Sequence, residues 1–154
     1  MKRVLFVCTG NICRSPTAEG VAQHFIQRGK LDGMVEVDSA GTHGYHAGEA
    51  PDPRSVKAAA RRGYDLSRLR ARKLDAGDFQ RFDLLLAMDR GHLELMTRAC
   101  PEVYRPKLAL FLDYAPLAEF DEVPDPYYGG PQGFEAVLDL CESGVGGLLD
   151  RLVR

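Results

Sequence analysis

Val4-Leu5-Phe6-Val7-Cys8-Thr9-Gly10-Asn11-Ile12-Cys13-Arg14-Ser15-Pro16 is the stretch that decides the fold. Its first four residues are apolar and mostly branched, which is typical of a buried strand. Ser15-Pro16, followed by good helix formers, is a helix start. Residues 8–15 are therefore predicted to form a turn that leads from a strand directly into a helix.

A strand-to-helix turn of this kind makes an anion site. Gly10 permits a tight curvature, so that successive backbone N–H groups converge on one point, and the positive end of the helix dipole faces the same point. The stretch lacks the Gly-Lys-Ser/Thr ending of a nucleotide-triphosphate loop. We expect a phosphate group to be bound by Thr9, Gly10, Asn11, Ile12, Cys13, Arg14 and Ser15.

The two ends of the loop distinguish it from an ordinary phosphate cradle. Cys8 lies at its start, and Arg14 follows six residues later with a guanidinium that can fork onto two phosphate oxygens. N–H donors, a helix N-terminus and a guanidinium together stabilise a cysteine as its thiolate. The loop is predicted to hold both a phosphate and the nucleophile that attacks it.

Length and composition indicate one globular domain over residues 1–154. The net charge of -2 argues against a general affinity for nucleic acid or for anionic membranes. The apolar run after Lys2-Arg3 breaks at Thr9, too early for a secretory signal, and no stretch approaches the roughly 18 apolar residues of a membrane span. We expect a cytoplasmic protein.

The four cysteines are predicted to be reduced thiols, because they form no CxxC pair and have no nearby set of histidines. Cys100 and Cys141 are expected in the core. For Cys13, plain packing and a reversible Cys8–Cys13 disulfide both stay open. His43 and His46 share a loop but lack a third ligand, so no metal and no cofactor are expected.

Apolar patterns predict strands alternating with helices along the chain. Strands are expected at 4–7, 34–39, 82–88 and 107–112, and helices after the loop, from 53 to 63, before Pro101 and from 134 to 152. Alternation of this kind implies a three-layer α/β domain with a parallel sheet covered on both faces. Residues 113–132 form a long loop, and loops of that length in a compact domain are usually functional.

Ligands of such sheets bind beyond the carboxyl ends of the strands. That edge should collect the Cys8 loop, the loop after Ser39, Asp89 and the loop that carries Asp125. Asp52 is expected mainly as an N-cap, and Asp89 as a cap or a loop brace. A basic set is either a solvated face or a patch that steers a phosphoprotein, and it comprises Arg61, Arg62, Arg68, Arg70, Arg72 and Lys73.

Cys-x5-Arg-Ser near the start and Asp125-Pro126-Tyr127-Tyr128 near the end resemble the low-molecular-weight protein tyrosine phosphatases. The likeness covers nearly the whole chain, including Ser39, residues 51–54, 71–72 and 88–89. It implies a four-stranded parallel sheet of order 2-1-3-4 with helices on both faces. It also implies hydrolysis of protein phosphotyrosine and small aryl phosphates through a cysteinyl-phosphate.

The resemblance implies a role for each matching residue. Cys8 would be the nucleophile, Arg14 the phosphate-binding arginine and Asp125 the general acid. Ser15 would donate a hydrogen bond to the thiolate, and Asn11 would hold the loop in a strained shape. The substrate pocket would be walled by Tyr45, Tyr127 and Tyr128.

One position departs from some relatives, which carry a histidine where this chain has Leu69, in a hydrogen-bonded chain that supports the loop. Two rivals share the architecture: a protein arginine phosphatase, which tends to carry Thr in place of Ile12, and an arsenate reductase, which needs further relay cysteines. A non-catalytic phosphate-binding module needs neither a thiolate nor an acid. We expect a monomer acting on phosphotyrosine proteins.

Overall fold

The computed structural model describes residues 1–116, 120–127 and 129–153. Its centre is a parallel sheet of order β2-β1-β3-β4. The strands are β1 (Lys2–Cys8), β2 (Val35–Gly41), β3 (Leu84–Ala87) and β4 (Leu108–Leu110). The predicted sheet and its strand order are confirmed.

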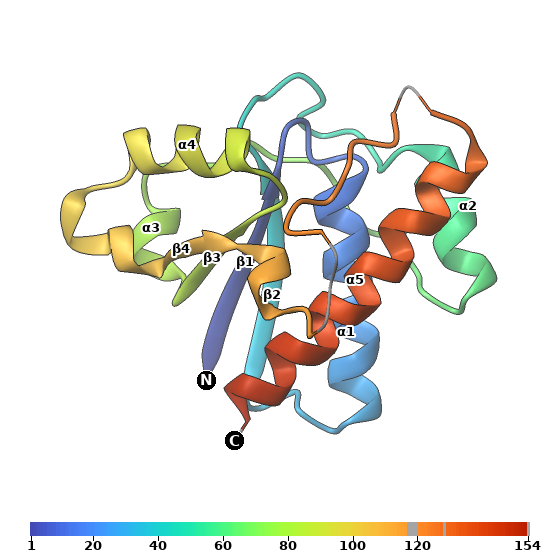
Figure 1. Cartoon of the computed structure of the whole chain (residues 1–154), viewed down its shortest axis with the longest axis horizontal. Coiled ribbons are helices and arrows are strands. Elements are labelled where there is room, and N and C mark those ends of the chain that lie inside the picture. The colour runs from blue at the N-terminus through green and yellow to red at the C-terminus, as the bar shows by residue number, and fades with distance from the viewer. Residues whose placement is uncertain (117–119, 128, 154) are drawn as a thin grey trace.

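Helices cover both faces of the sheet (Figure 1). One face carries α1 (Arg14–Arg28), α2 (Pro53–Arg61) and α5 (Pro131–Leu152), and the other carries α3 (Asp78–Arg81) and α4 (Arg90–Ala99). Two short 3₁₀ segments, η1 (Glu102–Lys107) and η2 (Phe111–Tyr114), flank β4. The predicted three-layer α/β architecture is confirmed.

β1 is the hydrophobic centre of the molecule because both of its faces are covered. Phe6 packs into the cluster beneath α1 and α5, whereas Leu5 packs into the cluster beneath α3 and α4. Val4, Leu5, Phe6 and Val7 are all fully buried. A strand buried on both faces reads as a continuous apolar run, which explains the pattern before Cys8.

Local signals place the helix ends that position the site. α1 ends at Arg28, and Gly29 follows as its C-cap. Asp52 caps α2 by accepting a hydrogen bond from the backbone N–H of Arg54, and Asp89 caps α4 by accepting one from the N–H of His92. Both predicted caps are confirmed.

The fourth strand is shorter than predicted. β4 ends at Leu110, and Phe111 and Leu112 belong to η2, where both are buried. An apolar run in a core looks the same in a strand and in a turn, so the pattern could not separate them. β2, in contrast, extends to Gly41, and α5 starts at Pro131 rather than at 134. The short helices α3 and η1 were not predicted.

None of the helices in the described ranges has the length and apolar character that a membrane crossing requires.

Candidate active site

The turn between β1 and α1 is built around Asn11. This residue has a left-handed backbone, φ 59°, and is 2% exposed. Its Nδ2 donates to Ser15 Oγ at 2.8 Å and to Ser39 Oγ at 2.9 Å, and its Oδ1 accepts from the backbone N–H of Arg72 at 3.0 Å. A left-handed conformation is costly for a residue with a Cβ, so these bonds hold the strained shape that we expected.

Cys8 ends β1 and its sulfur lies 2.9 Å from Ser15 Oγ. The Ser15 oxygen accepts a hydrogen from Asn11, and the Ser15 hydroxyl also lies 3.5 Å from the Ala40 carbonyl, to which it can donate. Ser15 and Cys8 are thus within hydrogen-bond distance of each other, as expected, and the donor role of Ser15 stays a prediction.

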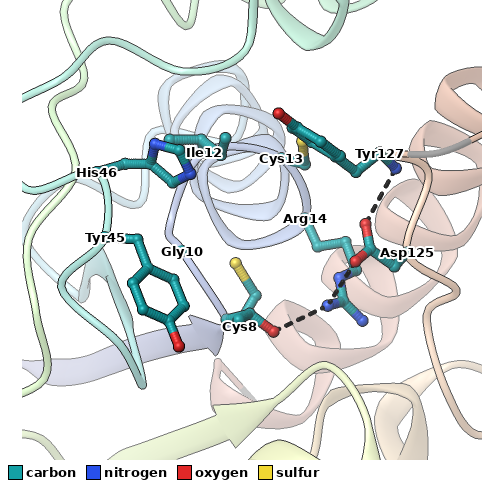
Figure 2. Close-up of a pocket in the computed structure, with 10 residues that line it drawn as sticks. Cys8, Gly10, Ile12, Cys13, Arg14, Tyr45, His46, Asp125 and Tyr127 are labelled. Carbon is teal, nitrogen blue, oxygen red and sulfur yellow. Dashed lines mark hydrogen bonds and ion pairs between the residues drawn. The ribbon is translucent and has the colours of Figure 1, made fainter.

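The sulfur lies at the floor of a pocket of about 240 Å³. Figure 2 shows it between Tyr45 and His46 on one side and Arg14, Asp125 and Tyr127 on the other. Tyr45 is 71% exposed and stacks on His43 at 5.0 Å between ring centres, so it stands at the rim. The remaining lining residues come from the loop itself: Thr9, Gly10, Ile12 and Cys13.

Arg14 is 4% exposed, and its guanidinium is held from two sides. One nitrogen donates to Asp89 Oδ2 at 2.8 Å and to the Val123 carbonyl at 3.1 Å. The other nitrogen lies 3.4 Å from Thr9 Oγ1. The guanidinium is thus pre-oriented at the pocket wall before any anion arrives.

Asp125 comes from the long loop before α5 and faces the same pocket. Its Oδ2 lies 3.8 Å from an Arg14 nitrogen, and its Oδ1 accepts a hydrogen bond from the Tyr127 backbone N–H at 3.0 Å. The side chain is 48% exposed, which leaves the carboxyl accessible from the pocket mouth. Tyr128, the third residue predicted for the pocket wall, lies outside the described residues.

Cys13, at the N-cap of α1, is buried beside the loop. Burial raises the pKa of the Cys13 thiol to about 12, and the Asp52 carboxylate adds to the effect. Cys100 and Cys141 are buried as predicted, and all four cysteines are free thiols. The Cys8–Cys13 disulfide stays a prediction.

Comparison with known proteins decides the family. The family model described as "Low molecular weight phosphotyrosine protein phosphatase" matches residues 3–154. The chain belongs to this family. A relative from Streptomyces coelicolor, named low molecular weight protein-tyrosine-phosphatase, is 47% identical over 150 residues, covering 96% of this chain and 91% of the relative. The human low molecular weight phosphotyrosine protein phosphatase is 39% identical over 142 residues, covering 91% of this chain and 89% of that protein.

Solved structures agree with this assignment. A protein tyrosine phosphatase from Entamoeba histolytica, crystallised with Hepes in its active site, superposes with a TM-score of 0.95 at 40% identity, covering 99% of this chain and 97% of that one. YfkJ from Bacillus subtilis superposes with a TM-score of 0.92 at 34% identity, covering 98% and 94%. The fold predicted from the resemblance to low-molecular-weight phosphatases is therefore that of the family.

His92 is a site residue of this phosphatase that the sequence did not reveal. It is 3% exposed, and its Nε2 lies 2.7 Å from Thr9 Oγ1 and 3.4 Å from an Arg14 nitrogen. Its Nδ1 faces Asp89 Oδ1 at 3.2 Å. Burial and the neighbouring Arg14 lower the pKa of His92 to about 4, so the imidazole is neutral and its Nε2 can accept from the Thr9 hydroxyl.

Glu19 is a second such residue. It is 6% exposed and accepts hydrogen bonds from Ser39 Oγ at 2.6 Å and from Gln23 Nε2 at 3.0 Å. Ser39 in turn accepts from Asn11, so Glu19 ends a chain of bonds that begins at Cys8. Burial raises the pKa of Glu19 to about 7.

Leu69 stands where some members of the phosphatase family carry a histidine, and here it packs against the core beneath α1. In its place, the Arg72 backbone N–H and the Ser39 hydroxyl complete the hydrogen bonding of Asn11. The loop is thus supported without an imidazole at position 69.

Salt bridges engage two arginines of the predicted basic set. Arg62 is paired with Glu135, Asp139 and Glu142, and Arg72 with Asp38 and Asp78, so these two members of the basic set stabilise the fold instead of forming a free patch. Within the described part of the chain, His/Cys/Asp/Glu side chains form no group of three that could hold a metal ion.

Proposed function

We propose that this chain hydrolyses protein phosphotyrosine and small aryl phosphates, with Cys8 as nucleophile, Arg14 as the phosphate-binding cation and Asp125 as general acid and base. The single observation that carries the proposal is the Cys8 sulfur, which lies on the floor of a pocket whose wall presents both Arg14 and Asp125. The names of the relatives support the choice of a phosphotyrosine substrate.

The proposed reaction has two displacements at phosphorus. The Cys8 thiolate attacks in line, the S–P bond forms, and the P–O bond to the phenol breaks as Asp125 gives its proton to the leaving oxygen. A water molecule then attacks the cysteinyl-phosphate, Asp125 accepts its proton, and the S–P bond breaks to release inorganic phosphate and the thiolate.

Charge that develops on the transferred oxygens is met by groups already in place. Arg14 is held by Asp89 and by the Val123 carbonyl, so it needs no reorganisation during the reaction. Cys13, the N-cap residue of α1, makes no side-chain capping bond with any described residue, which leaves the first amides of α1 for the anion. These groups are the proposed binding set, residues 9–15.

Pocket depth and its aromatic rim favour an aryl phosphate. The sulfur-bearing residue is 3% exposed, whereas Tyr45 is 71% exposed and Tyr127 is 39% exposed. A phosphate on a long, flat phenol reaches the floor while its ring lies between these two side chains, and a shorter phosphoserine does not. We also propose a cytoplasmic monomer, since a catalytic thiolate requires a reducing compartment.

The test compares turnover of a phosphotyrosine peptide, phosphoarginine and arsenate by the wild-type protein. We expect the phosphotyrosine peptide to be hydrolysed, Cys8→Ser to abolish turnover, and Asp125→Ala to slow it by about 10²- to 10⁴-fold. Faster turnover of phosphoarginine than of phosphotyrosine, or wild-type rates in Cys8→Ser, would contradict the proposal. Trapping of ³²P on acid-quenched protein checks the phosphocysteine.

A further inference from the structure

Two hollows near the mouth of the pocket are lined by different kinds of charged side chain. On one side of Asp125, a hollow of about 660 Å³ is edged by the carboxylates of Asp89, Asp121 and Asp139. On the other side, a hollow of about 230 Å³ lies between α2 and the start of α5 and is edged by Arg54, Lys57 and Arg61. We call the second one the α2–α5 hollow.

The three cations of the α2–α5 hollow share one helix face. Positions 54, 57 and 61 are separated by three and four residues on α2, so their side chains lie above one another. All three residues are exposed. Ala58 of α2 and Pro131 and Phe134 of α5 form the apolar part of the lining, and Gly129 and Gly130 complete it.

Arg54 ties this hollow to the active site. Its guanidinium lies 5.2 Å from the centre of the Tyr127 ring and 4.8 Å from that of Phe134. Tyr127 lines the pocket above Cys8, and Phe134 lines the α2–α5 hollow. The backbone N–H of Asp52, at the start of α2, also donates to the Ile12 carbonyl of the phosphate loop at 2.8 Å. The Arg54 guanidinium therefore contacts one ring from each of the two sites.

The cations differ in how far they are already neutralised. Arg54 donates from two of its nitrogens to the Asp52 carboxylate at 3.0 and 2.8 Å, so its charge is largely satisfied. Arg61 lies 3.7 Å from Glu135, but that carboxylate is closer to Arg62, at 2.9 Å. Lys57 has no ion pair with any residue in the described ranges. Lys57 and Arg61 therefore leave positive charge at the hollow.

We propose that the α2–α5 hollow receives an acidic side chain of the substrate, close in sequence to its phosphotyrosine. This inference rests on the proposed function and specifies the class of phosphopeptide that the same active site prefers. The bound phosphotyrosine passes between Tyr45 and Tyr127, and an extended peptide advances about 3.3 Å per residue, so a carboxylate within a few residues reaches beyond Tyr127. On the opposite side, the carboxylates of Asp89, Asp121 and Asp139 already pair with Arg14, Arg90 and Arg62, so the described lining of that hollow offers no free cation to the same group.

The charge of the hollow, its size and its position select this occupant. Exposed ion pairs are individually weak, so Lys57 and Arg61 act on the choice among peptides and not on the chemical step. A free small aryl phosphate has no flanking side chain and does not reach the hollow. The preference should therefore appear with peptides and vanish with small substrates.

The test measures kcat/KM for two phosphotyrosine peptides that differ only in having Glu or Gln at the flanking positions, alongside a small aryl phosphate. We expect the Glu peptide to be preferred by about three- to tenfold at low salt, less at high salt. Lys57→Ala/Arg61→Ala should bring the ratio close to one while leaving aryl phosphate turnover unchanged. Lys57→Glu/Arg61→Glu should favour a Lys-flanked peptide.

The matched control is Arg28→Ala/Arg98→Ala, which removes the same charge from α1 and α4, away from the pocket lining. It should keep the wild-type preference. Equal rates for the two peptides with the wild-type protein, or an undiminished ratio in Lys57→Ala/Arg61→Ala, would overturn the inference although aryl phosphate hydrolysis continues. If the wild-type protein hydrolysed neither the peptides nor the aryl phosphate, that result would instead count against the proposed function.

Discussion

Asn11 shows how one amide can hold a whole loop. Its two donors and its acceptor are all engaged, by Ser15, Ser39 and the Arg72 backbone. The Arg72 N–H can only donate, so it fixes which end of the amide is oxygen. That orientation places the Asn11 amide nitrogen on Ser15 Oγ, and one buried side chain thereby holds the hydroxyl that lies 2.9 Å from the Cys8 sulfur.

Two buried titratable residues next to this network have pKa values that move in opposite directions. Burial raises the folded pKa of Glu19 from 4.5 to about 7. The protonated carboxyl therefore contributes to the free energy of unfolding below pH 4.5, and this contribution is lost as the pH rises through 7. The folded pKa of His92 is lowered from 6.5 to about 4, so stability is lost as the pH falls from 6.5 through 4. The two effects partly cancel in the wild-type protein.

A variant separates the contribution of Glu19. Glu19→Gln keeps an oxygen that can accept from Ser39 but does not titrate, so its stability relative to wild type should rise between pH 4.5 and 7 and then level off. At about 1.4 kcal/mol per pKa unit the rise is at most roughly 3.5 kcal/mol. Urea unfolding across the pH range measures it. A pH-independent difference would show that Glu19 does not carry the proton.

At the scale of elements, the glycines of α5 are not equivalent. The sequence suggests that Gly144, Gly146 and Gly147 all weaken the helix. In the structure, a Cβ at 144 would lie 2.4 Å from the Phe111 ring and a Cβ at 147 would lie 1.8 Å from the Tyr114 carbonyl oxygen. These two glycines allow η2 to pack closely on α5.

Gly146 faces open space, since a Cβ there would meet no described atom within 4 Å. Gly146→Ala should therefore stabilise the protein by about 0.5–1 kcal/mol through helix propensity alone. Gly144→Ala is the matched opposite and should destabilise it by about 1–3 kcal/mol, because a fully buried Phe111 must move. Chemical denaturation of both variants checks the pair, and a destabilising Gly146→Ala would contradict the packing.

At the scale of the whole molecule, the sheet brings distant segments to one edge. β1 ends at Cys8 and β3 leads into Asp89, while the long loop is anchored there by the hydrogen bond from Val123 N–H to the Met88 carbonyl at 2.8 Å. The loop after β2 joins through the Thr42 N–H, which donates to the Cys8 carbonyl at 2.8 Å. An anion bound at this edge would therefore contact several parts of the fold at once.

Phosphate should consequently stabilise the folded protein as a whole. A ligand that binds only the folded state adds about 2.7 kcal/mol at 100 times its Kd, which for a domain of this size raises Tm by roughly 5–10 °C. Thermal unfolding in increasing phosphate measures the effect, with sodium chloride at matched ionic strength as the control. Equal shifts in the two salts would mean that no specific phosphate site exists.

The amino-acid sequence by itself determined the strands of the sheet, the Cys8–Ser15 loop and the caps Asp52 and Asp89, since strand patterns, turn glycines and capping residues act over a few neighbouring positions. The strand order came from the family resemblance. It also supplied Asp125 and Tyr127 through the family resemblance, and the structure brings both to the Cys8 pocket. Only the tertiary structure decided which residues support the loop. His92 meets Thr9 across 83 positions, and Glu19 reaches Asn11 through Ser39, 20 positions from Glu19. Contacts between residues so far apart depend on how the layers pack, and no local pattern carries that information.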